Sequence, residues 1–186
     1  MRIYFLRHGL TAGNLEKRYV GRTDEPLCDE GKEQLSGISL PACELLVCSP
    51  MKRCTETAEV LFPGQTPLLC KELREIDFGD FEGKNYPELN GNPRYQAWID
   101  SGGTLPFPNG EAPDGFRERC CEGFQRIMRE NKSAETAAFV VHGGTIMAVL
   151  DRFALPHRDY FDWQCANGHG YVCEFDGEKI TDTEKI

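Results

Sequence analysis

Residues 3–9 read Ile-Tyr-Phe-Leu-Arg-His-Gly, a short apolar run that ends at Arg7, His8 and Gly9. Two further apolar runs, residues 44–48 and 137–141, are also followed by polar residues and glycine or proline. Short continuous apolar runs are typical of strands buried on both faces of a parallel sheet. Helix-like stretches rather than hairpin turns flank them, which predicts βαβ units. We therefore expect an α/β fold with three layers, α/β/α, around a mostly parallel central sheet.

Four stretches are predicted to be helical: residues 29–38, 50–62, 114–130 and roughly 145–153. Ser49 is expected to cap the second helix and Pro50 to begin it. The run Gly170–Phe175, followed by Asp176-Gly177, predicts an edge strand and a turn. A chain of 186 residues suits one domain, so we expect a single domain over residues 1–186.

Glycines, prolines and aromatic residues cluster between residues 79 and 113. A long irregular insertion in a compact domain is usually functional, which predicts a lid-like segment over the substrate. A packed surface excursion is an equally good interpretation.

Composition excludes several classes of protein. The net charge is −9 and no basic stripe is present, which disfavours a nucleic acid partner. No run approaches the roughly 18 apolar residues that a membrane span needs. The start of the chain offers no signal peptide, so we expect a cytoplasmic protein that does not bind membranes. The sequence leaves the oligomeric state open.

The nine cysteines are scattered and odd in number, which is unlike a disulfide framework. No Cys-x-x-Cys pair exists, and His157 and His169 belong to no cluster of metal-ligand residues. We expect the cysteines to be reduced and mostly buried, and we expect neither a metal nor a cofactor.

In open α/β sheets, ligands bind beyond the carboxyl ends of the strands. The three predicted parallel strands lead there to Arg7 and His8, to Arg53, and to His142. A single histidine is more often structural than functional, but four such residues at equivalent positions indicate an active site.

Arg53 lies near the first turn of its predicted helix, where the helix dipole prefers anions to cations. A bound dianion between the arginine and the helix would explain this position. Phosphate suits the set, because arginines can fork onto its oxygens and a neutral imidazole can attack phosphorus. The second histidine, His142, could donate to oxygens where charge develops.

A proton donor for the leaving oxygen is expected among the carboxylates of residues 72–83. The residues alone leave five candidates open: Glu72, Glu75, Asp77, Asp80 and Glu82.

The chain resembles the histidine phosphatase superfamily, which includes the phosphoglycerate mutases. The matching motifs run in the family's order, from residue 3 to about residue 150: Leu6-Arg7-His8-Gly9 with Thr11 and Asn14, Gly21-Arg22-Thr23-Asp24, Ser49-Pro50 with Arg53, Leu73 and Glu75, and His142-Gly143-Gly144. The resemblance implies that His8 is the phosphorylated nucleophile and Glu75 the proton donor. It implies a substrate-binding set around them that includes Arg7, Thr11, Asn14, Gly21, Arg53, His142 and Gly143.

Two positions depart from the family's usual pattern, Leu10 after the first glycine and Glu56 before Thr57. Neither is implied in the proton or phosphate chemistry.

The resemblance favours a phosphatase acting on a small phosphorylated metabolite. Mutases of this family are longer and carry an extended insertion that shuts out water, whereas this chain is short, which favours hydrolysis. Residues 95–98, 108–111 and 116–119 are similar to the branch that dephosphorylates α-ribazole phosphate, and a sugar phosphate is a further possible substrate. Arg22 and Glu111 are the expected contacts to the leaving group. The alternatives are mutase-type phosphoryl transfer and a non-catalytic module that binds a phosphorylated ligand.

Overall fold

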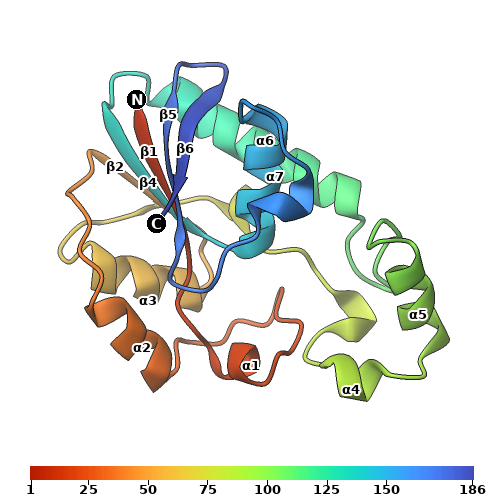
Figure 1. Ribbon diagram of the computed structural model, residues 1–186. Coiled ribbons are helices and arrows are strands. Elements are labelled where there is room, and N and C mark those ends of the chain that lie inside the picture. Colours follow the sequence, from red (N-terminus) through yellow and green to blue (C-terminus); the bar gives the residue numbers. More distant parts are fainter.

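The computed structural model describes residues 1–186 as a six-stranded sheet with helices on both faces (Figure 1). The strands are β1 (Arg2–Arg7), β2 (Leu45–Cys48), β3 (Leu68–Leu69), β4 (Thr136–Val141), β5 (Gly170–Phe175) and β6 (Ile180–Lys185). Their order is β3-β2-β4-β1-β5-β6, and the first four are mutually parallel. Strand β5 is antiparallel to β1 and to β6. The predicted α/β fold with a mostly parallel sheet is confirmed.

The helices are α1 (Ala12–Leu15), α2 (Asp29–Ser36), α3 (Lys52–Leu61), α4 (Tyr86–Leu89), α5 (Pro93–Asp100), α6 (Pro113–Glu130) and α7 (Gly143–Phe153). Single 3-10 turns occur at Lys71–Leu73, Gly79–Phe81 and Tyr160–Trp163. None of the helices combines the length and apolar composition that crossing a bilayer requires.

Alternate residues of the central strands supply two cores, because successive side chains of a strand point to opposite faces. On one face, Phe5 and Phe139 pack with residues of α6 and α7 such as Phe124 and Val149. On the other face, Leu6, Leu46 and Val140 pack with residues of α2 and α3. The sheet is therefore the middle of three layers, with one core on each of its faces.

The register of the sheet determines where the polar residues emerge. Arg7 pairs with Val141 across β1 and β4, and Cys48 pairs with Val140 across β2 and β4. These three parallel strands therefore end at one edge, and His8, Ser49 and His142 follow them there.

The predicted start of α3 is wrong by two residues. The helix begins at Lys52 with Met51 as N-cap, and Ser49 does not cap it. The Asp24 carboxylate accepts a hydrogen bond from the Lys52 amide at 2.7 Å instead. A side chain distant in sequence thus satisfies the helix end, and the Ser49 hydroxyl is free to contact His142.

Residues 79–113 form a packed extension that contains α4 and α5 (green in Figure 1). Phe81, Leu89, Tyr95 and Phe107 of this segment are buried in a third core with residues of α6 and α7 such as Phe116. The segment is therefore packed onto α6 and α7 through a core that it shares with them. Whether it acts as a lid stays a prediction.

Candidate active site

A cavity of about 310 Å³ lies beyond the carboxyl ends of β1 and β4. One part of its wall is polar and contains Arg7, His8, Asn14, Glu75 and the glycines at the start of α7. The other lining residues are mainly aromatic and come from several segments of the chain: Tyr19, Phe78, Trp98, Phe107, Phe116, Tyr160 and Phe161. The cavity can therefore accept a ligand with one anionic end and one apolar end.

His8 directly follows β1 and is only 4% exposed. Its Nδ1 lies 2.7 Å from the carbonyl oxygen of Gly9. A carbonyl oxygen can only accept, so Nδ1 carries the proton and Nε2 keeps its lone pair. The Gly9 amide donates to Thr57 Oγ1 at 3.0 Å, which ties this turn to α3. The turn thus presents one defined tautomer of His8.

His142 is the N-cap residue of α7 and is completely buried. Its Nε2 lies 2.8 Å from Ser49 Oγ, and its ring centroid lies 5.3 Å from that of His8. Burial is the main cause that lowers the pKa of both imidazoles well below the ordinary value of 6.5, and the Arg53 cation is the next. Both histidines are therefore neutral at pH 7.

Arg53 is the second residue of α3, and no part of its side chain reaches solvent. Its guanidinium donates to the carbonyl oxygens of Thr23 and Gly21, both at 2.7 Å, while its Nε is buried without a partner. Arg7 is similar: it donates to the carbonyl of Cys165 at 2.7 Å, and its Nε is also buried without a partner. Neither arginine forms a salt bridge with a carboxylate. Buried cations without counterions are costly, so the site favours an anion.

Glu75 lies on an irregular segment that passes the start of α7. Its Oε2 accepts a hydrogen bond from the Gly144 amide at 3.1 Å, and its Oε1 accepts one from its neighbour Ile76 at 3.0 Å. A Cβ atom at position 144 would collide with the Glu75 carboxylate, and one at Gly143 would lie 3.3 Å from Arg7 Nε. The two glycines therefore allow a carboxylate and a guanidinium to approach the N-terminus of α7 closely.

Asn14 also lines the cavity. Its Oδ1 accepts hydrogen bonds from the Thr11 amide at 3.2 Å and from Asn167 Nδ2 at 3.1 Å. With the oxygen occupied, the Asn14 amide nitrogen is left to donate to a ligand.

Thr11 and Gly21 hold the loops beside the site and are not part of the cavity wall. Thr11 caps α1 and donates from its hydroxyl to Glu25 at 2.8 Å. Gly21 offers its carbonyl to Arg53, and its amide donates to Glu82 at 2.8 Å. Glu82 also accepts from the Thr23 amide at 2.9 Å, so its carboxylate is engaged in holding this loop.

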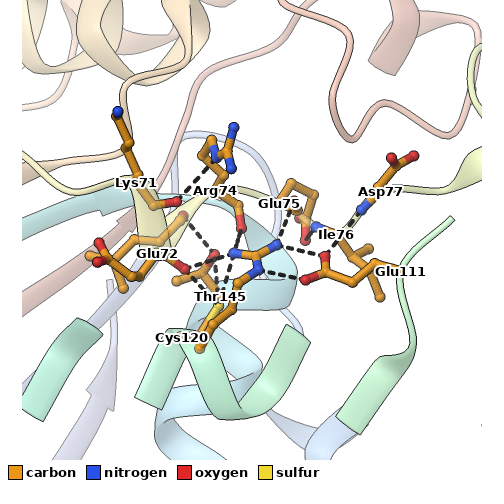
Figure 2. Close-up of polar contacts among 11 residues, drawn as sticks. Lys71, Glu72, Arg74, Glu75, Ile76, Asp77, Glu111, Cys120 and Thr145 are labelled. Carbon is orange, nitrogen blue, oxygen red and sulfur yellow. Dashed lines mark hydrogen bonds and ion pairs between the residues drawn. The ribbon is translucent and has the colours of Figure 1, made fainter. Parts of the chain in front are cut away.

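Arg53 and His142 are buried next to His8 without lining the cavity. The two expected leaving-group contacts, Arg22 and Glu111, also lie outside the cavity wall. The Arg22 side chain is 67% exposed and pairs with Asp77 at 3.3 Å. The Glu111 carboxylate pairs with Arg119 at 2.6 Å, and Figure 2 shows Glu111 near Glu75 and Asp77. Both residues lie near the site, but each side chain is engaged in an ion pair with a neighbouring residue, Arg22 with Asp77 and Glu111 with Arg119.

Two parts of the site were missed in the sequence. Asn167, in the loop before β5, donates to the His8 carbonyl at 3.1 Å as well as to Asn14. The aromatic wall receives Tyr160 and Phe161 from a 3-10 turn. No local sequence pattern marks Asn167 or the turn with Tyr160 and Phe161 as part of a site. Their loops reach the strand ends only through the tertiary fold.

All nine cysteines are free. No three histidine, cysteine, aspartate or glutamate side chains are grouped so that they could hold a metal ion.

Comparison with known proteins agrees with this geometry. The family model described as "Histidine phosphatase superfamily (branch 1)" matches residues 3–183. The adenosylcobalamin/α-ribazole phosphatase of Escherichia coli K12 is 31% identical over 82% of this chain and 78% of its own length. Phosphoglycerate mutase-like protein 4 of Arabidopsis thaliana is 30% identical over 96% of this chain and 82% of its own.

A solved structure, the α-ribazole phosphatase from Shigella flexneri, superposes with a TM-score of 0.84 over 97% of this chain and 94% of that one. Its sequence identity is 23%, so this likeness concerns the fold. The family model and the relatives confirm the resemblance expected from the motifs, and the chain belongs to the histidine phosphatase superfamily, branch 1.

Proposed function

We propose that this chain is a phosphatase that hydrolyses a small phosphomonoester through a phosphohistidine formed on His8. The observation that carries the proposal is the pair of arginines, half-buried Arg7 and fully buried Arg53, which lack carboxylate partners beside a neutral imidazole. Planar guanidinium groups suit the oxygens of a phosphate. The nucleophile they would serve has a free lone pair on Nε2.

In the first step, His8 Nε2 attacks phosphorus and the bond from phosphorus to the leaving oxygen breaks. The leaving oxygen takes a proton from Glu75, so an alcohol departs rather than an alkoxide. Arg7, Arg53, His142 and the Asn14 amide bind the phosphoryl oxygens as charge builds on them.

In the second step, water attacks the phosphorus of phosphohistidine while Glu75 accepts a proton from it. The bond between nitrogen and phosphorus breaks, and inorganic phosphate leaves. His8 returns as the neutral imidazole and Glu75 as the acid, so neither a metal nor a cofactor is required.

The aromatic wall favours a leaving group that carries an aromatic ring over a bare sugar. Two further arginines line the cavity, Arg18 and Arg117. Arg18 is paired with Glu16 and Glu88, both at 2.6 Å, and Arg117 stacks on the Tyr160 ring at 4.0 Å. A planar base could stack on these aromatic side chains. The base of α-ribazole phosphate, a fused aromatic ring, is of this kind. The relative named for α-ribazole phosphate supports this choice of substrate.

The alternative, phosphoglycerate mutase-type transfer, would require cations for a substrate carboxylate. Of the two further arginines in the cavity wall, Arg18 is already paired with two glutamates, so only Arg117 could serve this purpose, and the other side chains there are mainly aromatic. A cytoplasmic location remains a prediction from the sequence.

The test is a panel of metabolite phosphates, assayed for released phosphate with and without a chelator. We expect hydrolysis that the chelator does not change and a preference for nucleotide-like esters such as α-ribazole phosphate over sugar phosphates. No phosphate release from any ester, together with interconversion of phosphoglycerates after priming with a bisphosphate, would establish a mutase instead.

A further inference from the structure

The segment that carries Glu75 has little regular structure to hold it. It leaves the 3-10 turn Lys71–Leu73 and reaches the next turn only at Gly79. Carbonyl groups in such a segment need partners, because a buried backbone group without one is costly. One side chain of α6, Arg119, supplies the partners of three of these carbonyls, those of Glu72, Arg74 and Glu75, which are labelled in Figure 2.

The Arg119 guanidinium binds three carbonyl groups, two that precede Glu75 and that of Glu75 itself. Its Nη1 donates to the carbonyls of Glu72 and Arg74, both at 2.7 Å, and its Nη2 donates to the carbonyl of Glu75 itself at 3.0 Å. Only 23% of this side chain is exposed. One planar group thus holds the backbone immediately before and at the expected proton donor.

Glu111 completes the arrangement on the other side. Its two carboxylate oxygens accept from Arg119 Nε at 2.6 Å and from Nη2 at 2.7 Å, a bidentate pair. Its backbone amide donates to the Asp77 carbonyl at 2.9 Å, and its carboxylate accepts from the Asp77 amide at 3.4 Å. Glu111 therefore orients Arg119 and also holds the backbone of Asp77, two positions after Glu75.

We propose that Arg119 and Glu111 are positioning residues that hold the Glu75 carboxylate at the leaving oxygen. This rests on the proposed function, in which Glu75 is the proton donor. The Glu75 carboxylate touches only the Gly144 amide and its own neighbour, so its place depends on the backbone that carries it. A misplacement of about 1 Å in a reacting group can cost on the order of a hundredfold in rate.

A role in folding alone would predict a different result from a role in proton transfer. A loosened fold lowers activity on every substrate alike. A misplaced proton donor lowers activity on esters with poor leaving groups and largely spares esters of acidic phenols, which depart without help. The dependence of the loss on the leaving group is therefore the informative measurement.

The first variant is Arg119→Met, which keeps the length of the side chain and removes its donors. We expect kcat/KM to fall by about ten- to a hundredfold on a sugar phosphate and by less than about threefold on p-nitrophenyl phosphate. Arg119→Lys should recover only part of the loss, because a point charge cannot serve three carbonyls and a carboxylate in one plane. The control is Arg126→Met, on the same helix, whose exposed pair with Glu72 at 3.1 Å does not reach the Glu75 backbone. It should leave both activities unchanged.

A double-mutant cycle shows whether Arg119 acts through Glu75. In the Glu75→Gln background, Arg119→Met should cause no further loss on the sugar phosphate, since the proton donor is already absent. Glu111→Gln serves as a milder variant should Arg119→Met not fold, and it should show the same dependence on the leaving group.

Equal losses on both esters, or a full additional loss in the Glu75→Gln background, would overturn the positioning role and leave the proposed function intact. A wild-type enzyme that releases no phosphate, or a Glu75→Gln variant that shows no dependence on the leaving group, would overturn the proposed chemistry itself and the positioning role with it.

Discussion

The imidazole rings of His8 and His142 lie with their centroids 5.3 Å apart and their planes at 67° to each other. Each ring is fixed by a contact of its own, His8 by the Gly9 carbonyl and His142 by the Ser49 hydroxyl. The parallel register of β1 and β4 creates this relationship, because each histidine directly follows its strand. The two side chains therefore have different environments and, in our proposal, different roles: one attacks phosphorus and the other stabilises its oxygens.

Glu75→Gln tests the proton donor. The variant should slow an alkyl ester, such as a sugar phosphate, by several orders of magnitude, and an ester of an acidic phenol far less, because only the first needs a proton on its leaving oxygen. Steady-state kcat/KM on both esters gives the answer. The control is Glu72→Gln, whose carboxylate is exposed and pairs with Arg126 rather than lining the cavity. Equal losses on both esters in Glu75→Gln would remove Glu75 from this role.

Arg53→Ala tests the anion site. The substitution removes a buried cation and should weaken transition-state binding by about 2 to 5 kcal/mol. Arg53→Lys should restore only part of the lost transition-state binding, since an ammonium group cannot bind two phosphate oxygens in a bidentate manner. Vanadate inhibition of both proteins measures the effect directly. Lys52→Ala, an exposed neighbour in α3, changes the net charge equally and should bind vanadate like the wild type. Equal vanadate affinity in Arg53→Ala would mean that the arginine binds no anion.

The buried histidines predict a loss of stability in mild acid. Their pKa values are lowered in the folded chain, so below pH 6.5 the unfolded chain binds protons that the folded chain does not. Each histidine should then reduce the free energy of unfolding by up to about 1.4 kcal/mol per pH unit. Urea unfolding at pH 7.5 and 5.5 measures this.

In the same experiment, His8→Asn should show a smaller loss of stability between the two pH values than the wild type. His157→Asn is the matched control, because the His157 side chain is 61% exposed and should not alter the difference. The same pH dependence in wild type and His8→Asn would contradict the neutral, buried state of His8.

Phe161→Ser tests the aromatic wall. Phe161 lines the cavity and is 58% exposed, so its loss should cost little stability. We expect a higher KM for substrates with an aromatic leaving group, a nearly unchanged kcat, and no effect on sugar phosphates. Tyr86→Ser, at an equally exposed aromatic residue outside the cavity wall, serves as the control. A KM that rises equally for sugar and aromatic esters would show that the wall does not select the leaving group.

The parts of the fold that the sequence predicted are those with a strong local pattern. The apolar runs that became β1, β2 and β4 are buried in the sheet, and helix α6 begins within one residue of its predicted start. Strand β6 was missed because only Ile180 of its six residues is buried, so no apolar run marks it. The two-residue strand β3 lies at the sheet edge with both leucines exposed.

The candidate site could be predicted as far as chain order and strand ends determine it. His8, Ser49 and His142 follow strands whose ends coincide, so their meeting follows from the topology. The environments of Glu111 and Asn167 depend on contacts between segments far apart in sequence, such as the pair of Glu111 with Arg119. No local pattern contains that information.

The measurement that tests the central claim most directly is a rapid acid- and base-quenched reaction with a substrate labelled on its phosphoryl group. The label should appear on His8 before product accumulates, and the adduct should be stable in base and labile in acid, as expected for a bond between phosphorus and an imidazole nitrogen. His8→Ala should give no labelled protein and lower kcat by on the order of 10³ or more. The exposed-histidine variant His157→Ala should be labelled like the wild type. Label on His142 or on any cysteine, or turnover by His8→Ala at the wild-type rate, would contradict the assignment of His8 as the nucleophile.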